Sequence, residues 1–584
     1  MMNVPERKQA NAPSIAADWL ARFAAALSAQ DAAAAAQLFL PEGMWRDVLA
    51  FTWTIRTHYG RSEIEVMLRD TLARTKPCNF IIPPERTLPR WVSRAGTDCI
   101  ETILEFDTAF GRANAILRLV PDRENRMLAW TLNTNLQELR GHEEAYKRPE
   151  AQEDTRDFGG KSWLERRRED AAYADRDPAV LVIGAGQAGL AIGARLRQLG
   201  IDTLIVDRHA RIGDNWRTRY ASLTLHNERH VNHLPYMPFP PTWPVYLPKD
   251  MLANWFEAYA DAMELNVWSD TALIGGRYND TTGAWELYLR RADRTERTLR
   301  PRHLIFATGV SSTPVTPDLP GLKDFAGPAV HSGRLAGPEK WAGKTVLVLG
   351  SGTSGHDVAQ ELHAHGAHAT MIQRSKTYVV SLKEAQSVYA IYTEGIPFDD
   401  CDLLATSMPY PVLRRSYQLS TAKSSEIDKP ILEKLAARGF RLHFGEDETG
   451  FQMMYLRRGG GYYFNVGCSD LIAAGEIGLM QYDEIDRFVA HGARLKDGRI
   501  VPADLIVLAT GYKNQQDTVR LYLGETTADR IGPVWGFDDN GELRNMWRRT
   551  AQAGLWFTAG SLAQCRIYSR YLALQIKALE EGLI

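Results

Sequence analysis

Two glycine-rich segments contain the residue types and spacing most typical of chemistry. In the first, Gly184, Gly186 and Gly189 follow the apolar run AVLVI and precede an amphipathic helical pattern. Glycine at these places permits a tight turn, close approach of a pyrophosphate and close helix packing, and the helix N-terminus faces the phosphates. Asp207 ends the next apolar run, where a carboxylate accepts hydrogen bonds from ribose hydroxyls. This segment predicts a dinucleotide site.

The same pattern occurs a second time in KTVLVLGSGTSGHDVAQELHAHGAHATMIQRS, with Gly350, Gly352 and Gly355 at the same spacing. A second dinucleotide site is therefore expected. Here the following apolar run is succeeded by Arg374 and Ser375 instead of an acid. A cation beside a hydroxyl suits the 2′-phosphate of NADPH, which a carboxylate would repel. The pattern favours NADPH, leaves NADH as an alternative, and allows the simpler interpretation of Arg374 as a surface arginine.

Other types of site are disfavoured by the residues available. The formal net charge is -2, so the chain has no positive field to attract nucleic acid or anionic lipid. His363, His365 and His368 do not share one helical face, so no metal site is expected. The five cysteines form no CxxC pair, which argues against a disulfide redox centre and fits a reducing cytoplasm. Neither a signal peptide nor a run of about 18 apolar residues is present, so neither secretion nor a membrane span is expected.

The chain is long enough to need several cores to position these residues. At 584 residues it exceeds the size at which one hydrophobic core keeps growing. Helical patterns followed by long strand-like runs predict an α+β domain over residues 1–140, whose order resembles the cone-shaped nuclear transport factor and SnoaL fold. Residues 141–178 are dense in charge and predict a linker that ends in a solvated helix. The first glycine segment lies in a domain over residues 179–334 and the second in a domain over residues 335–509. Residues 510–584 complete the chain.

The order of the two glycine segments resembles the flavin-containing and Baeyer-Villiger group of class B flavoprotein monooxygenases, in which the first binds FAD and the second NADPH. FAGPAVHSGRL matches the FxGxxxH core of the group's identifying motif through His331, although Leu335 stands where the group has an aromatic residue. GDNWRTRY, with Trp216 and Arg217, is similar in part to the flavin-side GGxWR segment. Further positions that match the group are Thr308 and Gly309 in the first ATG triplet, Thr510 and Gly511 in the second, and Gly560, Gln564 and Ser569 near the C-terminus.

The N-terminal domain and one histidine resemble a particular branch of this group, the bacterial type II flavin-containing monooxygenases. That branch carries a similar N-terminal extension. It also has histidine where ordinary members have asparagine beside the flavin, and His226 stands at that position here. Asn227 follows directly, so a shift by one residue stays open, and so does the simpler interpretation of His226 as a histidine merely satisfied at a strand end. The plant YUCCA-type enzymes are similar through the same segment.

The resemblance implies an α/β fold with two Rossmann-like dinucleotide-binding domains, for FAD and NADPH, preceded by the α+β cone-shaped domain. FAD would occupy 179–334 together with 510–584, and NADPH would occupy 335–509, which also contains a helical insertion. The roof of the site, roughly 376–470, carries no motif of its own. Its Tyr389, Tyr392 and Tyr410 suggest an apolar, partly aromatic pocket.

The implied activity is that of an NAD(P)H- and O2-dependent monooxygenase. Such an enzyme forms a C4a-(hydro)peroxyflavin and inserts one oxygen atom into a small organic substrate, by S- or N-oxygenation or by Baeyer-Villiger oxidation of a ketone. His226 and Asn227 are then the candidate catalytic residues, since a histidine that titrates near neutrality would donate to or orient the peroxide. The alternatives are a YUCCA-like oxidative decarboxylation of a 2-oxo acid and an oxidase or reductase without oxygen transfer. A homodimer is compatible with the sequence.

Overall fold

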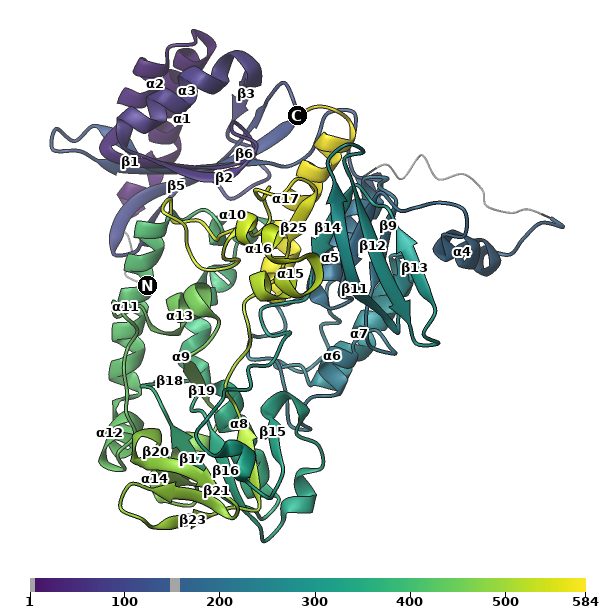
Figure 1. Cartoon of the computed structure of the whole chain (residues 1–584). Coiled ribbons are helices and arrows are strands. Elements are labelled where there is room, and N and C mark those ends of the chain that lie inside the picture. Colours follow the sequence, from purple (N-terminus) through teal and green to yellow (C-terminus); the bar gives the residue numbers. More distant parts are fainter. Residues whose placement is uncertain (1–5, 148–157) are drawn as a thin grey trace.

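The computed structural model describes residues 6–147 and 158–584 and is an α/β protein preceded by an α+β unit (Figure 1). The N-terminal unit contains α1 (Glu6–Ser28), α2 (Ala32–Gln37) and α3 (Gly60–Thr75), which pack on a seven-stranded sheet. Its strands are β1 (Phe39–Val48), β2 (Ile55–Tyr59), β3 (Cys78–Ile81), β4 (Arg90–Arg94), β5 (Thr97–Asp107), β6 (Arg112–Pro121) and β7 (Met127–Leu136). They pair in the order β2-β1-β7-β6-β5-β3, with β4 on β5. Trp19, Phe23 and Trp45 stack between helices and sheet and form its core.

The first Rossmann-like domain is built on a parallel sheet of β8 (Val180–Ile183), β9 (Thr203–Val206), β10 (Asn266–Trp268), β14 (His303–Phe306) and β25 (Leu555–Phe557). The strands pair in the order β10-β9-β8-β14-β25. Around it lie α4 (Trp163–Ala172), α5 (Gln187–Gln198), α6 (Asp214–Arg217), α7 (Lys249–Ala262), α17 (Leu562–Glu580), and a small sheet of β11 (Thr271–Asn279), β12 (Ala284–Arg291) and β13 (Glu296–Leu299). Because β25 and α17 come from the C-terminal end, they share one core with the strands β8, β9 and β14.

The second Rossmann-like domain contains β15 (Ala329–His331), β16 (Thr345–Leu349), β17 (His368–Gln373), β20 (Gly478–Gln481) and β24 (Leu505–Leu508), paired in the order β15-β24-β16-β17-β20. With it pack α8 (Thr353–Ala364), α14 (Cys468–Ala474), β21 (Ile485–Val489), β22 (Gly492–Leu495) and β23 (Ile500–Pro502). One boundary differs from the expectation. Parallel pairing with β24 places β15 in this sheet, so the chain enters the second domain before Ala329 and not after Arg334.

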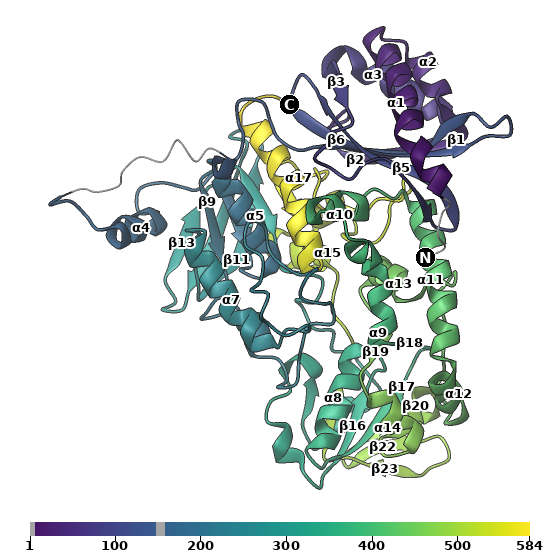
Figure 2. The ribbon, with the colours of Figure 1, turned by 180° about the vertical axis from the view of Figure 1, so that it is seen from behind.

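The helical insertion lies between the N-terminal unit and the second sheet (Figure 2). It contains β18 (Tyr378–Ser381), α9 (Leu382–Ala385), the 3₁₀ helix η6 (Gln386–Thr393), α10 (Phe398–Ala405), α11 (Tyr410–Ile427), α12 (Lys429–Ala437), α13 (Gly450–Arg458) and β19 (Tyr462–Asn465). The remaining elements are α15 (Gln515–Leu523), α16 (Glu525–Ile531) and the 3₁₀ helices η1 (Ala145–Lys147), η3 (Leu322–Asp324), η4 (Ser332–Arg334), η5 (Pro338–Trp341) and η7 (Tyr482–Glu484). Within the described ranges, no helix has the length and hydropathy of a membrane span.

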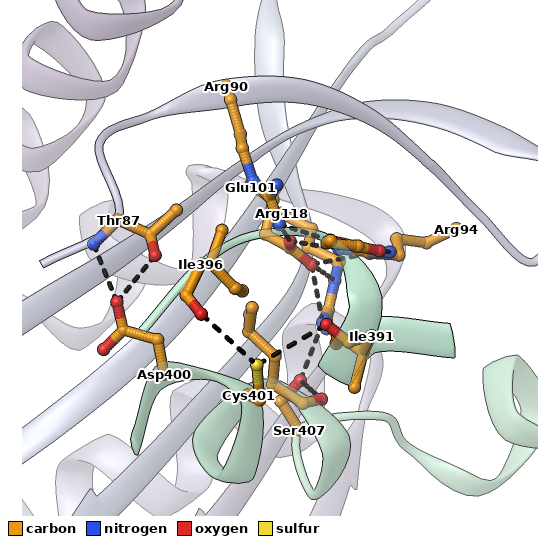
Figure 3. A network of polar contacts seen from close by, with 12 residues as sticks. Thr87, Arg90, Arg94, Glu101, Arg118, Ile391, Ile396, Asp400, Cys401 and Ser407 are labelled. Carbon is orange, nitrogen blue, oxygen red and sulfur yellow. Dashed lines mark hydrogen bonds and ion pairs between the residues drawn. The ribbon is translucent and has the colours of Figure 1, made fainter. Parts of the chain in front are cut away.

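A network of charged side chains fastens the N-terminal sheet to the insertion (Figure 3). Glu101 on β5 is buried and accepts hydrogen bonds from Arg94 at 2.6 and 2.9 Å and from Arg118 at 2.9 Å. Arg118 also donates to the Ser407 hydroxyl at 2.7 Å, beyond the end of α10. Asp400 on α10 accepts from the backbone and side chain of Thr87 at 2.8 and 2.6 Å. The N-terminal unit is therefore fixed against the elements that enclose the candidate site.

Candidate active site

The first glycine loop has a geometry that only glycine permits. Gly184 has φ +111°, and a Cβ there would lie 2.8 Å from the carbonyl oxygen of Ala307. A Cβ on Gly189 would lie 1.8 Å from the carbonyl oxygen of Gly184. Gly186 caps α5 without a side-chain hydrogen bond, and the one atom near its hypothetical Cβ is Asn215 Nδ2 at 3.3 Å. The start of α5 is thus free to receive a phosphate on its N–H groups.

Polar groups beside this loop fit a dinucleotide. Within the described part of the chain, Trp216 Nε1 and Thr308 Oγ1 are buried without a hydrogen-bond partner, and a polar ligand would satisfy them. Asp207 accepts from the Ala185 N–H at 2.7 Å and the His209 N–H at 2.9 Å. Burial opposes the Asp207 charge, but the hydrogen bond with the His209 ring, at 2.8 Å, together with these two backbone hydrogen bonds outweighs it and lowers the pKa of Asp207. The residues present therefore fit FAD.

The motif suggested that Arg217 lies on the flavin side, but its guanidinium contacts protein groups. Its guanidinium donates to the Ile212 carbonyl and the Asp214 carboxylate at 2.8 Å, and to Glu257 at 2.8 Å. These contacts hold α6 against α7. Arg217 therefore positions the Trp216 segment, and its own donors are directed at protein groups.

The second glycine loop repeats the first in detail. Gly350 has φ +124°, and a Cβ there would lie 2.3 Å from the Ala509 carbonyl oxygen. On Gly355 a Cβ would lie 2.0 Å from the Gly350 carbonyl oxygen, whereas Gly352 is open, with its nearest neighbour at 3.8 Å. Beyond β17, the next three side chains are exposed and two of them are cationic: Arg374, Ser375 and Lys376. This edge fits a nucleotide with an additional phosphate, and Lys376 extends the pair of residues predicted from the sequence.

Residues of the two ATG triplets, together with His331, join the two Rossmann-like domains to each other. Thr510 Oγ1 donates to the Val315 carbonyl at 2.6 Å, and the Val315 N–H donates to the Gly511 carbonyl at 2.9 Å. His331 Nδ1 accepts from the Gly333 N–H at 3.1 Å, which leaves the proton on Nε2, 3.1 Å from the Gly511 carbonyl. The Gly309 carbonyl accepts from Gln515 Nε2 at 2.8 Å. These residues set the relative position of the two loops.

A cavity of about 590 Å³ lies where α5, η6, α13 and α17 meet. Gln187, the first residue of α5, lines it and donates to the Gly560 carbonyl at 3.3 Å. Gln564 lines it as well and closes a capping box with Ser561 at the start of α17. Tyr389, Tyr392 and Tyr410 form part of its wall, as expected. Ser569 differs from the expectation because α17 turns it into the core, where it donates to the Arg566 carbonyl at 3.2 Å.

His226 and Asn227 both reach this cavity. The His226 ring packs edge-on against Phe464, with centroids 5.2 Å apart. Asn227 Nδ2 donates to the Tyr389 hydroxyl at 2.7 Å, so Asn227 holds η6 in place. Burial lowers the pKa of His226 to about 4, which corrects the expectation that it titrates near neutrality. At pH 7 this imidazole is neutral and offers one donor and one acceptor.

The low pKa of His226 predicts a pH-dependent contribution to stability. The unfolded chain takes up a proton at His226 near pH 6.5 and the folded chain only near 4, so the free energy of unfolding falls as the pH drops from 6.5 towards 4. His226→Gln removes this loss. We expect the urea midpoint of the wild type, minus that of the variant, to decrease between pH 7 and pH 5. A constant difference would contradict the assigned burial, and the other histidines cancel because both proteins contain them.

Comparisons with known proteins agree with this geometry. The family model of pyridine nucleotide-disulphide oxidoreductases matches residues 181–393. Indole-3-pyruvate monooxygenase YUCCA1 of Oryza sativa subsp. japonica is 31% identical over 338 residues, which cover 58% of this chain and 77% of that protein. The probable indole-3-pyruvate monooxygenase YUCCA4 of Arabidopsis thaliana is 29% identical, with coverages of 58% and 76%.

Solved structures with a similar arrangement include a flavin-containing monooxygenase from Stenotrophomonas maltophilia. It is 19% identical, with a TM-score of 0.47, and the match covers 69% of this chain and 99% of that one. A closed cyclohexanone monooxygenase is 17% identical, with a TM-score of 0.48 and coverages of 70% and 85%. The cysteines of this chain are all free and four of the five are buried. The residues matched by the disulphide oxidoreductase model contain both glycine loops with their helices, α5 and α8.

Proposed function

Because this chain belongs to the class B flavoprotein monooxygenases, we propose that its first glycine loop holds FAD, its second holds NADPH, and the cavity beside them receives the substrate. The enzyme uses NADPH and O2 to insert one oxygen atom into a small organic molecule. When bound, FAD supplies electron transfer from NADPH to O2 and thereby the reactive oxygen. The protein's part is to position, orient and exclude water.

The observation that carries this proposal is the continuity between the first glycine loop and the cavity. Gln187 is the residue directly after Gly186 and also part of the cavity wall, so a dinucleotide on α5 would extend its reactive end into the cavity. There it would meet His226, whose neutral ring donates one hydrogen bond and supplies no charge. Asn227 and Tyr389 hold the neighbouring wall, and the aromatic lining keeps water out.

The direct test is isotope transfer by the purified full-length protein. With NADPH, 18O2 and methyl phenyl sulfide, we expect one 18O atom in the sulfoxide for each NADPH consumed, and no product when NADPH is omitted. A cyclic ketone tested in parallel distinguishes oxygenation at sulfur from Baeyer-Villiger insertion. If all the oxygen appears as hydrogen peroxide with thioethers, amines and ketones alike, the protein is an oxidase and the proposal fails.

The exposed cations after β17 predict the choice of nicotinamide cofactor. Arg374→Gln removes a charge-assisted contact to the 2′-phosphate, worth about 1.5–3 kcal/mol or roughly 10- to 100-fold in affinity. We therefore expect the KM for NADPH to rise by that factor while the KM for NADH changes little. Steady-state kinetics with both cofactors measure this effect. Arg499→Gln, at an exposed arginine between β22 and β23 of the same domain, is the matched control, and equal shifts for NADPH and NADH would contradict the assignment.

A second candidate reaction comes from the rice relative, which is named for indole-3-pyruvate, a 2-oxo acid. Oxidative decarboxylation of a substrate of this class would bring a carboxylate into the cavity. Its test is release of CO2 from a 2-oxo acid in step with NADPH consumption. The charged side chains that line the cavity help to decide between this reaction and oxygen insertion into an uncharged substrate.

A further inference from the structure

Among the described residues that line the cavity, two belong to the charged residue types, Arg46 and Glu542. They come from opposite ends of the chain. Arg46 lies on β1 of the N-terminal unit, Glu542 lies in the segment before β25, and each is 6% exposed. The rest of the wall is apolar, aromatic, amide or hydroxyl, together with the neutral His226.

These two side chains are paired in the geometry that an arginine would offer to a carboxylate ligand. Arg46 Nε and Nη2 donate to the two oxygens of Glu542, each at 2.8 Å. Nη1 donates to the Thr406 carbonyl at 2.8 Å, and Thr57 Oγ1 donates to Glu542 at 3.0 Å. Burial opposes the charge on Arg46, but Glu542 and Tyr568 outweigh it and raise its pKa. The planar fork of the guanidinium is thus occupied by a protein carboxylate.

The pair is held in place from both sides. Tyr59 at the end of β2 donates to the Asn540 carbonyl at 2.9 Å, and Arg548 Nη1 donates to the Ile55 carbonyl at 3.2 Å. Strand β2, which pairs with β1 beside Arg46, is therefore fastened to the segment that carries Glu542. A ligand could not draw the Arg46 guanidinium away without breaking its hydrogen bonds to Glu542 and Thr406.

The consequence for a ligand follows from the cost of burying charge. A carboxylate that entered this cavity would leave water and find no free cation among the described residues that line it. If it displaced Glu542, it would leave that group unpaired instead. An uncharged aromatic or aliphatic molecule meets no such cost and gains from burial of apolar surface. Size alone does not distinguish a carboxylate from an uncharged molecule of the same shape. The pairing of Arg46 with Glu542 therefore determines which of them binds.

We propose that this cavity admits uncharged, largely apolar substrates, and that Glu542 is a specificity-determining residue that excludes carboxylates by occupying Arg46. The inference rests on the proposed function in taking this cavity as the substrate site. It disfavours 2-oxo acids and favours neutral thioethers, amines in their uncharged form, and ketones. It also gives the N-terminal unit a role, because that unit supplies Arg46.

The test compares two probes of equal size, 4-(methylsulfanyl)benzamide and 4-(methylsulfanyl)benzoate. Their dissociation constants are measured by titration calorimetry on the oxidised, FAD-loaded full-length protein without NADPH. We expect the wild type to bind the amide at least about tenfold more tightly, a difference of 1.4 kcal/mol. Glu542→Gln keeps the shape but frees Arg46, so the affinity for the benzoate should rise by about tenfold or more. Equal binding of both probes by the wild type, or an unchanged ratio in the variant, would overturn the proposal.

A double variant separates the role of Arg46 from that of Glu542. Arg46→Gln/Glu542→Gln removes both charges and avoids leaving either one unpaired, and it should keep the preference for the amide. If it gains benzoate affinity as the single variant does, Arg46 is not the carboxylate partner and the proposal fails. Glu525→Gln, on α16 outside the cavity, is the control and should bind both probes like the wild type. Loss of oxygen transfer with the binding preference intact would count against the proposed function alone.

Discussion

Gly189→Ala should be isolated without FAD, whereas Gly355→Ala should retain FAD and lose its reduction by NADPH. The two changes are sterically matched. The added Cβ would lie 1.8 Å from the Gly184 carbonyl oxygen in the first loop and 2.0 Å from the Gly350 carbonyl oxygen in the second. In each loop the added Cβ clashes with a backbone atom, so no side chain can move to relieve the clash. Each helix must therefore move away from its strand. The helix N-terminus then no longer faces the phosphates.

Flavin absorbance per protein, followed by anaerobic reduction, distinguishes the two outcomes. Gly355→Ala should be reduced normally by dithionite but at least about 100-fold more slowly by NADPH, because a displacement of about 1 Å is enough for such a loss. Gly460→Ala is the control, since that glycine has ordinary φ and nothing within 4 Å of its hypothetical Cβ. If Gly355→Ala lost FAD while Gly189→Ala kept it, the two loops would have been assigned in the wrong order.

Glu101→Gln should destabilise the junction between the N-terminal unit and the insertion by roughly 3 to 5 kcal/mol. Glu101 is 2% exposed and neutralises Arg94 and Arg118, the second of which is fully buried. The amide keeps the shape but leaves Arg118 without its counter-charge, whereas Arg94 keeps its pair with Glu394. Urea denaturation followed by tryptophan fluorescence at pH 7 measures the effect. Arg126→Met, which breaks an exposed pair with Asp122 in the same unit, should change the midpoint too little to measure.

The pH dependence of this effect has a definite sign. Burial by itself raises the pKa of Glu101, but Arg118 and Arg94 outweigh it and lower the pKa to about 2 from an ordinary 4.5. The stabilisation is therefore present above pH 4.5 and is lost as the pH falls from 4.5 towards 2. The difference between the wild type and Glu101→Gln should narrow over that range. A difference that stays constant down to pH 3 would show that the charge of Glu101 is not its source.

The sequence by itself was sufficient for the parts of this protein whose signals are local. Each glycine loop lies within one strand-turn-helix segment, so its three glycines, the helix after it and the acid or cation at its end are all readable within about 30 residues. The family and the α/β class followed from these segments and are confirmed. The assignment of FAD to the first loop and NADPH to the second stays a proposal. Strand β1 was not predicted, because the LPEG stretch interrupts its alternation and its last residues are buried without a break.

What only the tertiary structure decided is the direction and the environment of side chains. Ser569 and Arg217 match motifs, yet packing directs the first into the core and the second onto Glu257. Histidine ordinarily has a pKa of 6.5, and the lower pKa of His226, about 4, arises from its burial. Arg46 and Glu542 are separated by 496 positions, and no local pattern relates them. They meet because strands β1 and β2 of the N-terminal unit pack on the segment before β25. The low dielectric at that contact makes their pairing determine which charges the cavity admits.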